Sequence, residues 1–275
     1  MNIEAILAKY DSMFGKYSLS EIEDFLLKNI EEASLQNEKQ NLVSLLNEMI
    51  GFYRDTLQKE KALKNCDRLD LVLNELNLQG TIPYATSFLN IANAFRAFDL
   101  EKEAIALFEQ VEQIYQKNLP ENDFLFAGLY NNWALAYQEL TEFYMAAELL
   151  QKALIIVDCY PEAVIPQATT RTNLGISLLE TNTEEASVKA HHLLRQALNI
   201  FEKDGGKDFH YGAALVAMGD AGRHKKDYVN AAKYYQHGLA EIEKHTGKNE
   251  NYTRVQEKYD YVIQEAKLCG LWKSN

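Results

Sequence analysis

The sequence predicts an all-α fold made of stacked pairs of antiparallel helices, and three observations lead to this prediction. Only 4 prolines and 13 glycines occur in 275 residues, whereas an all-β chain needs a turn about every 8–12 residues. The hydrophobic fraction of 47% excludes intrinsic disorder and is sufficient for a large core. A pattern of small and apolar residues also recurs about every 42 residues, which is typical of helical repeats.

The second helix of each repeat is marked by a small residue with apolar residues four and seven positions later. The small residues are Ala62, Ala104, Ala146, Ala190 and Ala231, spaced 42, 42, 44 and 41 residues apart. Their companions are Cys66 and Leu69, Phe108 and Val111, Leu150 and Ala153, Leu194 and Ala197, and Tyr235 and Gly238. These spacings place each set on one face of a helix.

The first helix of each repeat carries a large residue, an apolar one three positions later, a small or apolar one next, and an aromatic three later. The copies are Leu46-Met49-Ile50-Tyr53, Phe88-Ile91-Ala92-Phe95, Tyr130-Trp133-Ala134-Tyr137, and the degraded Arg171-Leu174-Gly175-Leu178 and Leu215-Met218-Gly219-Gly222. Breaks at 97–99, 139–141 and 222–224 separate the two helices. A small residue where the helices cross lets the two backbones approach closely.

The prediction divides a single domain into three parts. Residues 1–37 form degenerate N-terminal helices, residues 38–247 form five repeats, and residues 248–275 contain a capping helix. In the first part, Ser18 and Glu21 have the spacing of a capping box, which marks a helix start. The last part has an amphipathic pattern from Asn251 to Leu268, as expected where a stack must present a polar outer face.

The fourth repeat departs from the pattern, because two or three extra residues occur near 180–185. The insertion lengthens either the loop or the second helix. Thr181 and Glu184 again have the spacing of a capping box, so we expect the helix to restart there.

The third repeat has the most informative local sequence. It reads Tyr130-Asn131-Asn132-Trp133-Ala134-Leu135-Ala136-Tyr137, followed by Tyr144, Ala146 and Ala153. This pattern resembles the tetratricopeptide repeat (TPR) family, although the step is about 42 residues rather than the usual 34 or so. The longer step resembles the repeats of kinesin light chain and of Gram-positive peptide receptors. The resemblance implies a right-handed superhelical solenoid with the first helices inside, and a concave groove that binds a protein or peptide.

Asparagines recur on the predicted inner helices. Asn90, Asn132 and Asn173 stand just before an apolar core residue, and Asn47, Asn93 and Asn131 lie on a neighbouring strip. A carboxamide both donates and accepts hydrogen bonds, so such a ladder is suited to the backbone of an extended peptide. The alternative is that these side chains only bond the adjacent helix.

Three further positions are candidates for specificity. Arg54 and Arg96 are one repeat apart, with Gln138 at the matching third position. Two guanidinium groups on one wall would bind a carboxylate of the partner, unless Arg54 pairs with Asp55 or Glu48. Tyr130 is the candidate anchor for an apolar side chain, and Tyr84 and Tyr211 are placed similarly.

Charge is distributed unevenly along the chain. The formal net charge is −12, which argues against nucleic acid as a partner. Residues 203–248 nevertheless contain eight lysines and arginines against six acids, beside an acidic stretch at 121–190. The contrast either orients a partner or reflects a solvated outer face.

The sequence contains no motif that predicts catalysis or a cofactor. No nucleophile elbow, phosphate loop or zinc-protease motif occurs, and the three cysteines are too far apart for a metal site. Among the histidines, His192 and His237 are the pair that would approach in space, and we expect no metal site there. Neither a signal peptide nor a membrane span is apparent, so we expect a cytoplasmic protein.

These observations together predict a non-enzymatic scaffold that binds a protein or extended peptide in its groove. One alternative is an intracellular receptor for a short signalling peptide. Another is an accessory subunit of a neighbour-encoded enzyme. Self-association through the terminal helices is a further possibility, because Leu271 and Trp272 would leave an apolar patch there.

Overall fold

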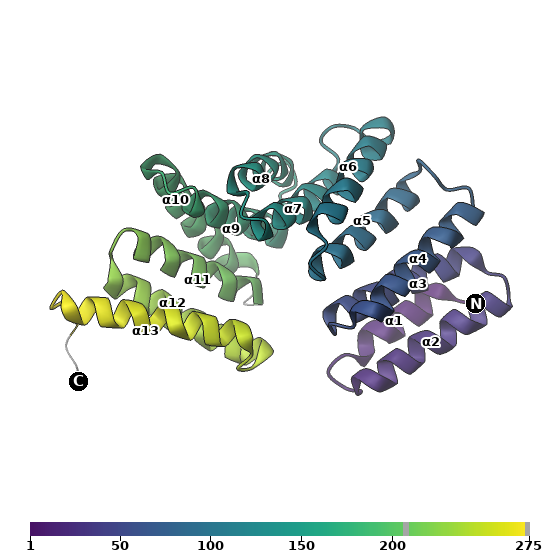
Figure 1. Ribbon diagram of the computed structural model, residues 1–275, viewed down its shortest axis with the longest axis horizontal. Helices are drawn as coiled ribbons and strands as arrows, with labels where there is room; N and C mark the ends of the chain where they lie inside the picture. Colours follow the sequence, from purple (N-terminus) through teal and green to yellow (C-terminus); the bar gives the residue numbers. More distant parts are fainter. Residues whose placement is uncertain (206–208, 273–275) are drawn as a thin grey trace. The chain divides into compact units, whose positions relative to one another are not determined.

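The computed structural model (Figure 1) describes residues 1–205 and 209–272, and in these ranges it contains helices and no strand. The all-α prediction is therefore confirmed. The helices are α1 (Ile3–Met13), α2 (Leu19–Leu35), α3 (Lys39–Asp55), α4 (Lys59–Glu75), α5 (Ile82–Ala97), α6 (Glu101–Asn118), α7 (Phe124–Glu139), α8 (Phe143–Val157), α9 (Val164–Glu180), α10 (Glu184–Ile200), the π-helical turn η1 (Phe201–Gly205), α11 (Phe209–His224), α12 (Tyr228–Thr246) and α13 (Glu250–Leu268).

Two compact units divide the chain, Met1–Glu121 and Asn122–Asn275. The first unit contains α1 to α6 and the second contains α7 to α13. The single continuous domain expected from the sequence stays a prediction.

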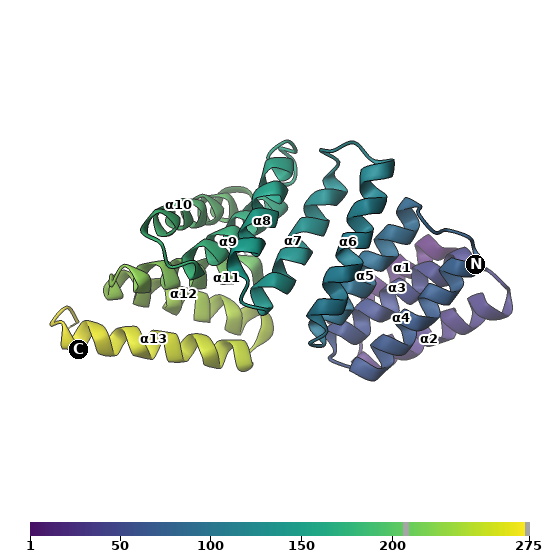
Figure 2. The ribbon, with the colours of Figure 1, turned by 45° about the horizontal axis from the view of Figure 1, so that its top comes forward.

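Consecutive helices pack as pairs within each unit (Figure 2). In the first unit α3 packs against α4 and α5 against α6, and in the second the pairs are α7 with α8, α9 with α10, and α11 with α12. Helix α13 lies against α12, at the place of the predicted capping helix; residues 273–275 of that segment lie outside the described residues.

The small residues of the repeat pattern lie where the paired helices cross. Ala62, Ala104, Ala146, Ala190 and Ala231 are all 0% exposed. At two crossings the partner residue is a glycine whose missing side chain makes room for a neighbour. A Cβ atom at Gly175 would stand 2.7 Å from Leu194 Cγ, and one at Gly219 would stand 2.6 Å from the Tyr235 ring.

The turns inside the pairs share one backbone geometry. A non-glycine residue with positive φ stands in each of them, namely Leu57, Asp99, Thr141, Asn182 and Lys226. In four of the five, the next N–H bonds back to a carbonyl five residues earlier, as in Gln58 to Tyr53 and Glu142 to Tyr137, both 2.8 Å. This bond satisfies a carbonyl at the end of the first helix and so fixes the turn length.

The fourth helix pair shows where the extra residues of its repeat are accommodated. Ala190 lies six residues after the start of α10, whereas Ala146 lies three residues after the start of α8. The insertion therefore lengthens the second helix, and the turn keeps three residues. The expected restart at Thr181 is wrong: Thr181 ends α9, and Thr183 caps α10 by accepting from the Ala186 N–H at 3.2 Å.

The capping box at the start of α2 is confirmed. The Ser18 hydroxyl accepts from the Glu21 N–H, and the Ser18 N–H donates to the Glu21 carboxylate at 2.9 Å. The charge of Glu21 stands in the first turn, where the helix dipole favours it.

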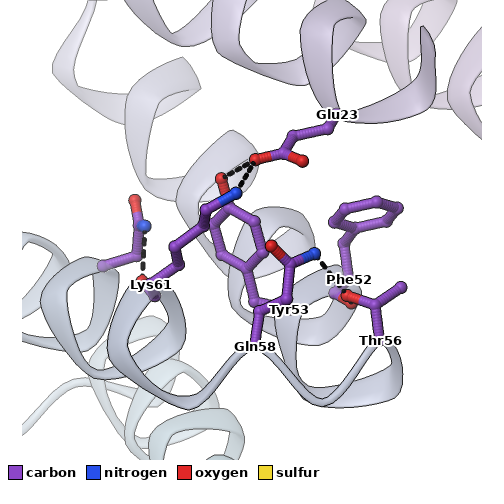
Figure 3. Close-up of polar contacts among 7 residues, drawn as sticks. Glu23, Phe52, Tyr53, Thr56, Gln58 and Lys61 are labelled. Carbon is purple, nitrogen blue, oxygen red and sulfur yellow. Dashed lines mark hydrogen bonds and ion pairs between the residues drawn. The ribbon is translucent and has the colours of Figure 1, made fainter. Parts of the chain in front are cut away.

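A polar cluster joins α2, α3 and α4 in the first unit (Figure 3). The Tyr53 hydroxyl donates to Glu23 at 2.8 Å, and the Lys61 ammonium donates to the same carboxylate at 2.6 Å. The Lys61 ammonium also lies 5.3 Å from the centroid of the Tyr53 ring, within the range of a cation–π contact. The hydrogen bond from Lys61 holds the pKa of the Glu23 carboxyl below its usual value.

Replacing Lys61 with methionine should weaken this unit in a pH-dependent way. Because the pKa of Glu23 is lowered in the folded protein, its ion pair contributes fully to stability above the unfolded-state pKa of ~4.3. This contribution is lost as the pH falls through the folded-state pKa. We expect Lys61→Met to lower the free energy of unfolding by at most about 1 kcal/mol at neutral pH, since the pair is partly exposed. Urea unfolding at neutral pH and at about pH 3 measures this.

Glu23→Gln is the matched control for that experiment. It removes the carboxylate and keeps Lys61, so it should cost a similar amount at neutral pH and little in acid. A loss in Lys61→Met that is equally large in acid would assign the effect to packing on Tyr53 and not to the ion pair.

A second polar cluster ties α11, α12 and α13 together. The Tyr235 hydroxyl donates to Asp220 at 2.7 Å, and the Lys258 ammonium donates to the same carboxylate at 2.8 Å. Beyond α13, Trp272 packs against the core of α12 and α13, while Leu271 is 59% exposed. Self-association through this end stays a prediction.

Candidate functional site

A pocket of about 440 Å³ opens on the face formed by the first helices of the second unit. We call it the first-helix pocket. It is lined by Phe124, Ala127, Gly128, Asn131, Asn132, Leu135, Val157, Ile165, Pro166, Thr169, Thr170, Asn173 and His210. These residues come from α7, the end of α8, α9 and the start of α11. Three of the predicted binding residues, Asn131, Asn132 and Asn173, therefore meet in one pocket.

The three asparagines hold the pocket wall together through their amide groups. Asn131 Nδ2 donates to the Ala127 carbonyl at 3.0 Å and to Thr170 Oγ1 at 2.8 Å. Asn173 Nδ2 approaches Asn131 Oδ1 at 3.4 Å, which links α9 to α7. Asn132 Nδ2 donates to the Gly128 carbonyl at 2.9 Å. Part of the ladder thus has the structural role that was the alternative interpretation.

Other polar atoms of the pocket keep their capacity for hydrogen bonds. Within the described residues the carboxamide oxygens of Asn132 and Asn173 accept no hydrogen bond. Thr169 Oγ1 is buried and has no partner there. A buried hydroxyl without a partner is costly, so this pocket is suited to a guest that brings its own polar atoms.

Gly128 is an exposed residue of the pocket lining with open space beside it. A Cβ atom built on it would meet no atom within 4 Å, although the residue lies inside α7. A glycine there forgoes roughly 1 kcal/mol of helix propensity relative to alanine. The Asn132 amide bonds the Gly128 carbonyl, so the two residues are neighbours in the pocket lining.

The predicted residues of the first unit form a smaller ladder between α3 and α5. Asn90 Nδ2 donates to the backbone carbonyl of Asn47 at 2.9 Å, and Asn47 Nδ2 donates to Ser87 Oγ at 3.1 Å. Asn93 lies one turn further along α5, and its Oδ1 atom is buried without a partner in the described part of the chain. The structure thus brings Asn47 and Asn90 together, and Asn93 adds an acceptor nearby in sequence.

The predicted specificity residues have intramolecular contacts. Arg54 Nε bonds Asp55 at 2.8 Å, and the Arg54 side chain is 29% exposed. Arg96 is half-buried near the end of α5. Gln138 Nε2 donates to Ser177 Oγ at 2.7 Å and to the Asn173 carbonyl at 3.1 Å, so it braces α7 against α9. Recognition of an acidic group by the two arginines stays a prediction.

Tyr130 is placed inside the fold. It is 8% exposed, stacks on Phe126 at 5.9 Å between ring centroids, and lies under the Lys152 ammonium at 5.2 Å. Tyr84 and Tyr211 are also buried. Sequence reasoning missed the residues that give the pocket its apolar wall, chiefly Phe124, Ile165 and Pro166, since they belong to the ends of helices and not to the repeat motif.

One signal could have located the pocket. A small residue stands four positions before each ladder asparagine on α7 and α9, as Gly128 before Asn132 and Thr169 before Asn173. Residues i and i+4 share a helix face, so a small residue there leaves space beneath the asparagine.

Metal-binding clusters and membrane-spanning helices are both absent from residues 1–205 and 209–272. No group of three or more His, Cys, Asp or Glu is placed to hold a metal ion. In the same ranges no helix is both long and apolar enough to cross a membrane. Cys66 is buried, and burial raises the pKa of its thiol to about 12, while Cys159 and Cys269 are exposed.

Comparison with known proteins shows similarity of fold. No family model matches the sequence, and no curated protein does either. The TPR-like repeats from Podosopora anserina assigned to a kinesin light chain match 72% of this chain and 94% of their own, with 19% identity and a TM-score of 0.59. BtubC (BKLC) from P. vanneervenii matches 94% of this chain and 95% of its own, with 14% identity and a TM-score of 0.66.

RapI in its apo form is similar over 97% of this chain and 72% of its own length, with 13% identity and a TM-score of 0.65. All three likenesses have an identity of 19% or less, so they speak for the arrangement of helices and not for a shared activity. The helix pairs and the similar solved structures agree: this chain has the fold of the tetratricopeptide repeats.

Proposed function

We propose that the chain is a non-enzymatic binding module that takes an extended segment of a protein or peptide on its first helices. The observation that carries the proposal is the first-helix pocket, which combines an apolar wall with acceptor oxygens on Asn132 and Asn173. The backbone of an extended peptide supplies N–H donors for such oxygens, and its side chains supply apolar surface.

The pocket also restricts the kind of side chain that fits. No carboxylate, guanidinium or ammonium group lines it, and His210 is its one titratable residue among those described. A charged guest would lose its hydration without gaining a partner. The anchor residue of the bound segment is therefore an uncharged apolar one, such as leucine or phenylalanine, and the volume lies within the range of ligand pockets.

Gly128→Leu tests the proposal, because it places a bulky side chain at the pocket lining without removing a contact. A leucine side chain in this free space should weaken binding of peptides with a central leucine or phenylalanine at least about tenfold. The measurement is fluorescence polarisation with peptides selected on a random peptide array against the full chain. Helix content and thermal unfolding should be unchanged or improved, since glycine is a poor helix former.

Ala240→Leu is the matched control. It adds an apolar side chain at an exposed position of α12 that does not line the pocket, and it should leave binding unchanged. Equal affinity of wild type and Gly128→Leu for every selected peptide would place the interface elsewhere. In that case Arg54→Ala/Arg96→Ala would examine the first unit next.

The same peptides distinguish a receptor for a signalling peptide from an accessory subunit of an enzyme. A receptor for a short signalling peptide would bind an isolated peptide tightly enough to raise the melting temperature, because a ligand of the native state stabilises by mass action. An accessory subunit would bind only a folded partner, and free peptides would leave the melting temperature unchanged.

A further inference from the structure

A second cleft, of about 420 Å³, lies between the second helices α10 and α12 and shares no residue with the first-helix pocket. We call it the second-helix cleft. Its lining consists of His191, Met218, Gly222, Lys225, Asp227, Asn230, Lys233, Tyr234 and His237. The floor comes from α11, which packs against both α10 and α12.

Basic side chains reach the cleft from three elements. His191 comes from α10, Lys225 from the turn after α11, and Lys233 and His237 from α12. In the described ranges none of these four has an ion pair within 4 Å, although Lys39, Lys61 and Lys258 elsewhere pair with a carboxylate. The cleft is thus a local positive site on a chain with 40 acids and 28 lysines and arginines.

The one acid in the lining is already engaged. Asp227 is the N-cap of α12, where its carboxylate accepts from the Asn230 N–H at 3.4 Å and from Asn230 Nδ2 at 2.8 Å. Its charge lies against the start of the helix, where the dipole favours it. It is not ion-paired with either lysine in the described structure.

The donors on α12 form a continuous strip. Asn230, Lys233, Tyr234 and His237 have the spacing i, i+3, i+4 and i+7, which is one helix face. His191 faces them from α10. Burial lowers the pKa of the His191 imidazole, and the charges of Lys225, Arg195 and His192 lower it further. The positive charge of the cleft therefore comes from its lysines, and His191 serves as a neutral hydrogen-bonding group.

We propose that the second-helix cleft binds a phosphoryl group, carried either by a small molecule or by a phosphorylated side chain. A phosphoryl group brings up to two negative charges and three acceptor oxygens, which matches lysines and imidazoles arriving from several directions. No arginine lines the cleft, so its cationic contacts come from lysine, which binds phosphate as a point charge. Met218, which is buried, supplies the apolar part of the floor.

Titration of the full chain with phosphate compounds tests this. The probes are inorganic phosphate, phosphoserine and phosphotyrosine, with acetate and chloride at equal ionic strength as comparisons. The readouts are the imidazole resonances of His191 and His237 and the heat of binding. We expect saturable shifts with the phosphate probes only. Lys225→Gln/Lys233→Gln should weaken binding at least about tenfold, as the loss of charged hydrogen bonds requires.

Lys244→Gln/Lys248→Gln is the matched control, since it removes the same charge near the end of α12 and outside the cleft. It should change the affinity by no more than about twofold. Tighter binding of phosphoserine or phosphotyrosine than of inorganic phosphate would identify a phosphorylated side chain as the source, and equal binding would identify a small phosphate compound.

Three results would overturn the proposal: no saturable shift with any phosphate probe, equal shifts with acetate or chloride, or equal loss of affinity in the two double variants. All four lysines are exposed, so the variants should fold like the wild type.

Discussion

Tyr235→Ala is expected to lower the free energy of unfolding by about 3–5 kcal/mol, as for other large aromatic residues cut back to alanine in a core. Tyr235 is 0% exposed, and its ring fills the space left by Gly219 on α11. Its hydroxyl also bonds Asp220, which holds Lys258 of α13. The substitution therefore leaves a cavity and weakens the link between three helices.

Hydrogen exchange of the full chain locates this loss. Amides of α11, α12 and α13 should exchange faster in Tyr235→Ala, because local opening of these helices becomes cheaper. Tyr235→Phe is the control, since it keeps the ring and removes one hydrogen bond to a carboxylate, and it should cost about 1.5–3 kcal/mol. If Tyr235→Phe were as damaging as Tyr235→Ala, the hydroxyl network and not the packing would dominate.

Gly175→Ala should destabilise the second unit, although glycine to alanine within a helix normally stabilises. The new Cβ atom would stand 2.7 Å from Leu194 Cγ and 2.8 Å from Leu194 Cδ2, and Leu194 is 0% exposed. Such overpacking costs about 1–3 kcal/mol. Gly51→Ala has no atom within 4 Å of its Cβ and should instead gain up to about 1 kcal/mol. Urea unfolding of both variants measures the opposite signs.

A double-mutant cycle with Leu194→Ala separates the steric clash from other causes. Leu194→Ala alone should cost about 2–5 kcal/mol, and it removes the side-chain atoms that the new Cβ of Gly175→Ala would meet. In that background Gly175→Ala should become neutral or stabilising, which is a coupling between neighbours. An unchanged penalty would show that the helix backbone at Gly175, and not Leu194, resists the extra carbon.

The repeat pattern predicted the helix pairs because the same small residue, alanine, has the same packing role in every copy. Ala62, Ala104 and Ala146 each stand where two helices cross, so their spacing carries the architecture directly. The restart at Thr181 was predicted wrongly because two threonines, Thr181 and Thr183, are both suitable caps. Only Thr183 has the extended backbone that an N-cap needs.

The binding residues were harder to derive, because an asparagine on a helix can serve a neighbour or a ligand. Asn131 and Asn132 are adjacent in sequence, yet Asn131 bonds Thr170 while the Asn132 oxygen stays unpaired in the described structure. The difference depends on which α7 side chain points towards α9, and the spacing of residues in the sequence does not predict this. The second-helix cleft was missed for a similar reason: His191, and not its neighbour His192, faces His237 across the cleft.

The uniform turns inside the pairs have a consequence for how such a chain can grow or be re-engineered. Each is a three-residue joint. Four of the five are closed by a backbone hydrogen bond like that between Gln58 and Tyr53, which an extra residue would break. The segments between pairs, such as 76–81 and 158–163, are longer and can absorb insertions at small entropic cost. Tags, fusion partners or duplicated modules should therefore be spliced between pairs, where the cut leaves every joint intact.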